Sequence, residues 1–280
     1  MFSSLASGLS MISEPVLVGD IGGTHSRWAI YAGGLTEVEV CRTASSGSLR
    51  DAVQPWAGRY RAAGVAVAGP VEDGRVLLTN ADWRATESDL DVPVRLVNDL
   101  AAVALGVPLL EPEDFVWWGR RAASLERVLC IGVGTGFGGA LHTPEGVVAM
   151  EPGHELLGDA FPGHTVESVV SGTALAVHRD DAALRTAFKL AVDRLVDRWA
   201  PDAVCLIGGV VENREELFAE YGHPSVAYGR IIHPHPALIG AARAAIAALR
   251  MTRDDPCITL ECPSGVHRGL RAPLPRESDV

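Results

Sequence analysis

The stretch Val16–Tyr31, VLVGDIGGTHSRWAIY, decides the fold class. Val16–Gly19 is a short apolar run that predicts a buried strand, and Asp20-Ile-Gly-Gly-Thr24 is a cluster of turn-forming residues. Trp28–Tyr31 then resumes an apolar strand. We therefore expect a hairpin whose turn is made by glycines, because glycine adopts the backbone angles of tight turns at little cost.

The same pattern returns in the second half of the chain. Val128–Val133 is an apolar run, Gly134-Thr135-Gly136 follows it, and Gly139–His142 resumes a strand. Both halves thus begin with a strand, a turn of glycine and threonine, and a second strand. The sequence predicts a repeat of the architecture without a repeat of the residues themselves.

Strands alternate with helices along the rest of the chain, which predicts an α/β fold with a largely parallel or mixed sheet. Further strands are expected at Val65–Ala68, Val94–Val97 and Ala203–Ile207. Helices are expected at Leu49–Arg61, Thr86–Leu90, Leu100–Val107, Ala182–Trp199 and Ala237–Leu249. Residues 1–14 are Ser-rich and residues 252–280 lack periodicity, so we expect a loose extension and a poorly ordered tail.

Composition and charge exclude several classes of function. The 280 residues suffice for two domains or one large one. A formal charge of −11 argues against a surface for nucleic acid or anionic membrane, which needs clustered Lys and Arg. Lys189 is the single lysine and lies in a helix-like run, which argues against a P-loop and against a Schiff-base enzyme. No apolar run approaches about 18 residues, so no membrane span is expected.

The cysteines and the N-terminal residues predict a soluble protein of a reducing compartment. The five cysteines are scattered and form no C-x-x-C pair, which argues against a zinc knuckle or a disulfide framework. Cys130 and Cys205 fall within apolar strand runs, where we expect small core residues. The first fourteen residues lack the basic start and the long apolar stretch of a secretory signal. A cytoplasmic location is therefore predicted.

Polar clusters follow the predicted strands. They are Asp20, Asn98-Asp99, Gly134-Thr135 and Gly208-Gly209. Ligands of α/β folds sit at the carboxyl ends of strands, so we expect these clusters to share one cleft.

The two glycine hairpins suit phosphate. Glycines let backbone N–H groups approach a phosphate closely, and the hydroxyl of Thr24 adds a donor. The Asp20 carboxylate would repel phosphate unless a cation lies between them, which suggests Mg²⁺ bound through water. Taken alone, the cluster is equally an ordinary glycine turn. Two such hairpins together suit the two ends of a triphosphate, and the strand after Gly136 argues against a dinucleotide fingerprint.

Asn98 and Asp99 lie between a strand and a helix, so Asp99 could be a helix cap. The functional interpretation is that Asp99 is a general base for a sugar hydroxyl and Asn98 fixes the neighbouring hydroxyl. Gly208-Gly209 could admit a flat adenine or serve close helix packing. His233 and His235 alternate with prolines and are assigned no chemistry.

Glu151, His154 and Glu167 follow the second hairpin. Carboxylates and a neutral imidazole pair well with vicinal sugar hydroxyls, each of which donates and accepts hydrogen bonds. Glu151 and His154 also have the spacing of metal ligands, but no third ligand is evident nearby.

Taken together and in order, these blocks resemble the bacterial glucokinase family, whose members are sugar kinases of the actin-like ATPase superfamily. The blocks are LVGDIGGTHSR (17–27), VAVAGPVEDGRVLLTNADW (65–83), VRLVNDLAAVALGVPLL (94–110), GVGTGFG (132–138), EPGH (151–154), HTVESVVSG (164–172), CLIGGVV (205–211) and PALIGAA (236–242). The resemblance covers roughly residues 15 to 250.

The resemblance implies two ribonuclease-H-like lobes with a cleft between them. Residues 15–107, completed by 237–251, would form the small lobe, and 108–236 the large lobe. It implies transfer of the terminal phosphoryl group of Mg-ATP to the 6-hydroxyl of glucose, and leaves a homodimer open. By position, Asp99 matches the catalytic base. Asn98, Glu151, His154 and Glu167 match the sugar ligands. The phosphate and adenosine loops match Asp20, Gly22, Gly23, Thr24, Gly134, Thr135, Gly136, Gly208 and Gly209.

The sequence also departs from the family pattern. His25 stands where Asn is usual, Pro152 stands where Gly is usual, and the chain between Gly172 and Ala191 is shorter than usual. Pro152 removes a backbone donor and stiffens the approach to Gly153. These differences motivate two alternatives, a non-catalytic sugar or nucleotide sensor and a kinase of another hexose such as mannose or an amino sugar. Another phosphoryl donor is also left open.

Overall fold

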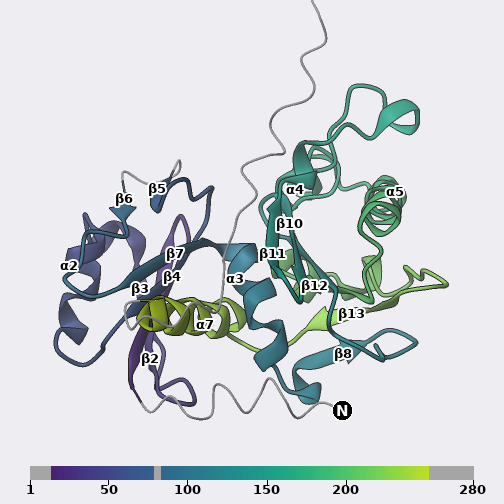
Figure 1. The fold of residues 1–280 in the computed structure, drawn as a ribbon. Helices are drawn as coiled ribbons and strands as arrows, with labels where there is room; N and C mark the ends of the chain where they lie inside the picture. The colour runs from purple at the N-terminus through teal and green to yellow at the C-terminus, as the bar shows by residue number, and fades with distance from the viewer. Residues whose placement is uncertain (1–13, 79–82, 252–280) are drawn as a thin grey trace, which may run out of the picture.

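The computed structural model describes residues 14–78 and 83–251. Two β-sheets stand side by side, with helices α3 (Asp99–Gly106) and α7 (Pro236–Met251) between them (Figure 1). The extension predicted at 1–14 lies almost entirely outside the described residues, as does the tail predicted at 252–280.

The first sheet contains the predicted hairpin. Its strands, in spatial order, are β3 (Glu39–Arg42), β2 (His25–Tyr31), β1 (Val16–Ile21), β4 (Ala63–Val67) and β7 (Val94–Asn98). β1 pairs antiparallel with β2 and parallel with β4, and β4 pairs parallel with β7. A two-stranded sheet of β5 (Arg75–Leu78) and β6 (Trp83–Thr86) accompanies it.

The second sheet confirms the predicted repeat. Its strands, in spatial order, are β11 (Gly146–Met150), β10 (Phe137–Thr143), β9 (Val128–Val133), β12 (Ala203–Ile207), β13 (Ala227–Ile231) and β8 (Phe115–Trp117). β9 pairs antiparallel with β10 and parallel with β12, as β1 does with β2 and β4. Each sheet therefore presents a hairpin turn at the edge where its parallel strands end. Cys130 and Cys205 are buried neighbours on β9 and β12, as expected of core residues.

Helices cover both sheets. Besides α3 and α7 they are α2 (Leu49–Val53), α4 (Gly172–His178), α5 (Asp181–Trp199) and α6 (Gly209–Asn213). α7 packs across β1, β4 and β7, while α3 packs between α7 and strands β9 and β10. A Cβ at Gly240 would collide with the carbonyl of Ala102, so glycine is what lets α3 and α7 lie this close. Because α3 touches both sheets, its first residue sits between them.

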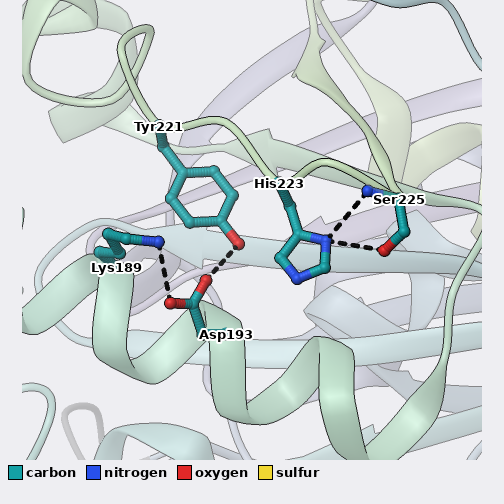
Figure 2. Close-up of polar contacts among 5 residues, drawn as sticks. All are labelled: Lys189, Asp193, Tyr221, His223 and Ser225. Atoms are coloured by element: carbon teal, nitrogen blue, oxygen red, sulfur yellow. Dashed lines mark hydrogen bonds and ion pairs between the residues drawn. The ribbon is translucent and has the colours of Figure 1, made fainter.

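Helix α5 covers the second sheet and carries the chain's single lysine, as predicted. Figure 2 shows that Lys189 pairs with Asp193, whose carboxylate also accepts a hydrogen bond from the Tyr221 hydroxyl. His223 accepts hydrogen bonds from Ser225 on the same segment. Asp193 thus links α5 to the segment that carries Tyr221, and Lys189 pairs with it within the helix.

Two helix predictions are wrong. The helix expected at Leu49–Arg61 ends at Val53, and Pro55 and Gly58 lie in the turns that follow it. The helix expected at Thr86–Leu90 is absent: Thr86 ends β6, and the Asp89 carboxylate binds its N–H at 2.9 Å and its hydroxyl at 2.8 Å. Short polar side chains that bond nearby backbone compete with a helix in this way. In the described ranges, no helix combines the length and the apolar character that crossing a membrane requires.

Candidate active site

A cavity of about 510 Å³ opens between the two sheets. It brings together Asp20, Asp99 and Gly208, three residues that the sequence places after different strands. The complete lining is Asp20, Arg27, Asp99, Leu100, Val103, Ile207, Gly208, Glu212, Arg230, Ile231, Ile232, His233, Pro234, His235, Pro236 and Ala237. The expectation of a shared cleft at strand ends is thus met for three of the four polar clusters.

Asp20 lies on β1 directly opposite Arg27 on β2. Arg27 Nη1 donates to Asp20 Oδ2 at 3.2 Å, and the Asp20 side chain is only 21% exposed. Burial raises the pKa of Asp20 above its ordinary value, and the Arg27 guanidinium opposes that rise. Asp20 was expected in the turn, but it lies in the strand, and only Gly22–Thr24 form the turn. The turn is anchored from behind, since the Thr43 hydroxyl donates to Gly22 O at 2.6 Å.

Asn98 ends β7 and Asp99 begins α3. Asn98 Oδ1 accepts from the N–H groups of Leu100 and Ala101, both at 3.0 Å, so Asn98 is the helix cap. Its Nδ2 donates to Gly69 O at 3.2 Å. The helix cap considered for Asp99 is thus supplied by Asn98, and Asp99 lines the cavity.

The carboxyl group of Asp99 has a perturbed acidity. Burial raises its pKa from the ordinary 3.8 to about 6, the Leu100 N–H opposes the rise, and the charges of Asp20 and Glu151 add to it. Asp99 therefore lies near enough to interact with both carboxylates. Asp20 belongs to the first sheet, and Glu151 directly follows β11 of the second sheet. A carboxyl group with this pKa is ionised at pH 7 and is a stronger base than an ordinary aspartate.

Glu151, His154 and Glu167 do not line the cavity and form a second cluster next to it. His154 Nε2 lies 3.7 Å from Glu167 Oε1. Desolvation raises the pKa of Glu151; His154 opposes this rise and Glu167 adds to it. Pro152–His154 form a 3₁₀ turn directly after β11, which places Glu151 at the strand's end.

Glycine residues allow the second hairpin and the turn after β11 to pack closely against the Glu167 side chain. A Cβ at Gly136 would lie 2.9 Å from Glu167 Oε2, and one at Gly153 would lie 3.1 Å from the same oxygen. The turn itself is fixed by α4, because the Gly172 N–H donates to Gly134 O at 2.7 Å and the Thr173 hydroxyl donates to Thr135 O at 3.0 Å. The Gly134–Gly136 turn thus touches the Glu167 side of the site and lies outside the cavity lining.

Gly208 ends the loop after β12 with φ of +110°, and a Cβ there would lie 2.5 Å from Val133 O. Both facts require glycine. Gly209 begins α6 and does not line the cavity. The predicted loop therefore contributes one glycine to the cavity and one to a short helix.

Several cavity residues were missed by the sequence reasoning. Arg27, Glu212 and Arg230 received no role, and His233 and His235 were explicitly given none. A signal existed, because the histidines follow an apolar strand as the other site residues do. β13 was not predicted, since Gly229-Arg230 interrupts its apolar run.

Asp20 fits a magnesium site of the kind that uses one carboxylate, water and substrate phosphates. The fit rests on its largely buried carboxylate at the cavity wall. Within 14–78 and 83–251, no group of three or more His, Cys, Asp or Glu side chains is arranged to hold a metal ion.

Comparison with known proteins places the chain. The glucokinase family model matches residues 17–162. The chain belongs to the glucokinase family. A glucokinase of Caulobacter sp. (strain K31) is 38% identical over 168 residues, which are 53% of this chain and 51% of the relative. A glucokinase of Xanthomonas campestris pv. campestris (strain B100) is 30% identical, covering 85% of this chain and 97% of the relative. The match thus spans about half of the Caulobacter relative and nearly all of the Xanthomonas one.

Solved structures agree in fold. A glucokinase from an Antarctic psychrotroph superposes with a TM-score of 0.69 at 22% identity, covering 84% of this chain and 99% of the other. A ROK hexokinase from Thermus thermophilus superposes with a TM-score of 0.63 at 21% identity, covering 84% and 99%. The predicted actin-like ATPase fold is confirmed.

Proposed function

We propose that this chain is an ATP-dependent hexose kinase that phosphorylates the 6-hydroxyl of glucose. The observation that carries the proposal is the position of Asp99, which shares a cavity with Asp20 and senses the charge of Glu151. A base at that position lies between the candidate phosphate site and the candidate sugar site. Family membership and the near-complete match to a Xanthomonas glucokinase support glucose as the acceptor.

In this proposal, the two lobes contribute different groups of ligand-binding residues. Residues 15–107 with 237–251 make the small lobe, and 108–236 make the large lobe, in agreement with the division of strands between the two sheets. Glu151, His154 and Glu167 bind the sugar hydroxyls, and Asn98, through the free N–H of its amide, reaches a neighbouring hydroxyl. The turns Gly22–Thr24 and Gly134–Gly136 donate backbone N–H groups to the phosphates, and Gly208-Gly209 borders the adenosine.

In the proposed step, Asp99 orients the 6-hydroxyl and accepts its proton as the oxygen bonds to the terminal phosphorus. The bond from that phosphorus to the bridging oxygen breaks, and ADP leaves with the electron pair. Asp20 would hold Mg²⁺ through water, and the ion, when bound, would neutralise charge on the phosphates. Closure of the lobes would exclude water, so that the sugar receives the phosphoryl group.

The compartment and assembly belong to the same proposal. ATP and the buried, unpaired thiols of Cys130 and Cys205 fit the reducing cytoplasm. Homodimer formation stays a prediction, which sedimentation of the purified protein measures.

The test is a coupled assay of ADP formation with Mg-ATP and a panel of glucose, mannose and glucosamine. We expect glucose to be the best acceptor, and Asp99→Asn to keep glucose binding in calorimetry while turnover falls roughly 10²–10⁴-fold. Glucose binding without ADP formation would favour a sensor. Normal turnover in the variant would remove Asp99 from the role of base.

A further inference from the structure

The loop between β13 and α7 lines the cavity without a part in the proposed function. Residues from Arg230 to Ala237 contribute an unbroken stretch of the wall, and within it His233 and His235 are separated by a single proline. Neither histidine belongs to the sugar cluster around Glu151. A loop that supplies so much of the wall, facing Asp20 and Arg27, is positioned to touch whatever fills the cavity.

The loop holds its histidines in fixed places. Pro234 and Pro236 flank His235 and fix the backbone angle on either side of it. The Ile232 N–H donates to Asp114 O at 2.7 Å, and the carbonyl of His235 accepts from the Ile239 N–H of α7 at 3.3 Å. The backbone of such a loop loses little conformational freedom when the loop binds a ligand.

Hydrogen bonds set the proton position on both rings. His233 Nδ1 accepts from the His235 backbone N–H at 3.0 Å, so the neutral ring of His233 carries its proton on Nε2. His235 Nδ1 is buried and has no hydrogen-bond partner among the described residues. A proton there would have no acceptor, which favours the form with the proton on Nε2. Each ring therefore offers an Nε2–H donor.

The surroundings of His235 disfavour the protonated form of its ring. Burial, Arg27 and His233 lower the pKa of His235, and Asp20 opposes them. The ring therefore donates a hydrogen bond without adding a positive charge. A neutral N–H group of this kind can donate a hydrogen bond to a phosphate oxygen.

We propose that His233 and His235 donate from Nε2 to phosphate oxygens of the donor nucleotide. The proposal rests on the proposed function, because it assigns the cavity to the nucleotide. The phosphate chain is favoured over the adenosine because both histidines share the cavity wall with Asp20 and Arg27 of the first hairpin, and His235 lies near enough to interact with the charges of both residues. Gly208 and Glu212 lie on the part of the wall formed by β12 and α6.

The test is calorimetric binding of the non-hydrolysable ATP analogue AMP-PNP, with Mg²⁺ and without sugar. We expect His233→Ala and His235→Ala each to weaken binding about 10-fold, the loss of one hydrogen bond to a charged group. Adenosine, which lacks phosphate, should change in affinity less than about 2-fold, because it makes neither bond.

Matched variants separate binding from folding. A glutamine amide nitrogen reaches about as far as Nε2 and an asparagine one about as far as Nδ1, so His235→Gln should keep affinity within roughly 3-fold and His235→Asn should not. His223→Ala is the control, since His223 also accepts a local hydrogen bond at Nδ1 but lies outside the cavity lining. Thermal melting of each variant reports whether it folds.

Unchanged AMP-PNP affinity in the alanine variants would overturn the proposal. So would an equal loss for adenosine and AMP-PNP, or an equal loss in His235→Gln and His235→Ala. An enzyme that phosphorylates glucose with an unaltered KM for ATP in both alanine variants would overturn this inference alone. A protein that binds AMP-PNP through the two histidines but phosphorylates no hexose would overturn the proposed function alone. A wild-type chain that binds no AMP-PNP would overturn both.

Discussion

The two hairpins at the carboxyl ends of the sheets share a topology but differ at equivalent positions. The penultimate residue of β1, Asp20, faces Arg27, whereas the penultimate residue of β9, Gly132, faces Gly138. The first pair is an ion pair at the cavity wall, and the second pair has no side chains at all. One architecture thus supplies a charged hairpin in one half and a bare one in the other.

The bare pair makes room for the helix that carries Asp99. A Cβ at Gly132 would lie 2.8 Å from Leu100 Cδ2, and one at Gly138 would lie 2.6 Å from Leu100 Cδ1. Leu100 directly follows Asp99, so its seat on the second hairpin helps fix where the carboxylate points. The charged hairpin thus presents side chains to the cavity, while the two glycines of the bare hairpin make room for Leu100 and so help to position α3.

Neutralising the charged hairpin should have the largest effect. Asp20→Asn removes the carboxylate proposed to hold the metal ion, so we expect turnover to fall roughly 10²–10³-fold. Glu39→Gln, at an exposed carboxylate on neighbouring β3, is the control and should leave turnover unchanged. Turnover with Mg-ATP measures both, and equal turnover in the two variants would contradict the role proposed for Asp20.

Next in size is an effect on stability: the ionised carboxylate of Asp99 should lower the free energy of unfolding. The folded pKa of Asp99 is about 6 against an ordinary 3.8, so between these values the folded state binds more protons and stability falls as pH rises. Asp99→Asn removes this penalty, and at pH 8 the variant should be more stable by about 3 kcal/mol, from about 1.4 kcal/mol per pKa unit. Urea denaturation at pH 5 and pH 8 tests this, because the gain must be smaller at pH 5.

The raised pKa of Asp99 should also appear in the pH dependence of activity. Because only the ionised Asp99 acts as a base, kcat/KM should fall about tenfold per pH unit below pH 6. A profile that stays level from pH 7 to pH 5 would contradict that role.

A methyl group on the bare hairpin should disturb α3 more modestly. Gly138→Ala pushes Leu100 from its seat, so we expect about 1–3 kcal/mol of destabilisation and a loss in kcat of about 10-fold. Gly134→Ala is the matched control for stability, because a Cβ at that position meets nothing within 4 Å. Urea denaturation separates the two, and equal destabilisation would mean that Leu100 adapts freely.

The smallest effect is expected at the tip of the second hairpin. Thr135 is exposed and its carbonyl is already bound by the Thr173 hydroxyl, so the turn survives loss of the Thr135 side chain. Thr135→Val removes a single hydroxyl donor, and the KM for ATP should rise about 5-fold with little change in kcat. A change as large as that of Asp20→Asn would show that the bare hairpin is no less critical than the charged one.

The sequence was most informative where apolar runs end in polar residues. That pattern located β1, β9 and β12, and with them Asp20 and Gly208. It failed at β13, where Gly229-Arg230 breaks the run, and so His233 and His235 received no role. The Arg27–Asp20 pair could not be predicted either, because it depends on the register across the hairpin.

The wrong helix prediction at Thr86–Leu90 has a different cause, which is competition between hydrogen bonds of nearby side chains and those of a helix. Thr86 looked like a helix cap, yet the Asp89 side chain bonds its N–H and hydroxyl and closes a turn. A single sequence does not show which of two hydrogen-bonding partners the tertiary structure favours.

The single lysine has a practical consequence for proteolysis. A protease that cuts only after lysine has one bond to attack, Lys189–Leu190, and this bond lies within α5 between the buried residues Phe188 and Ala191. Cleavage requires the helix to open away from the second sheet. The rate at which two fragments appear would therefore count the openings of that half of the molecule without any added label.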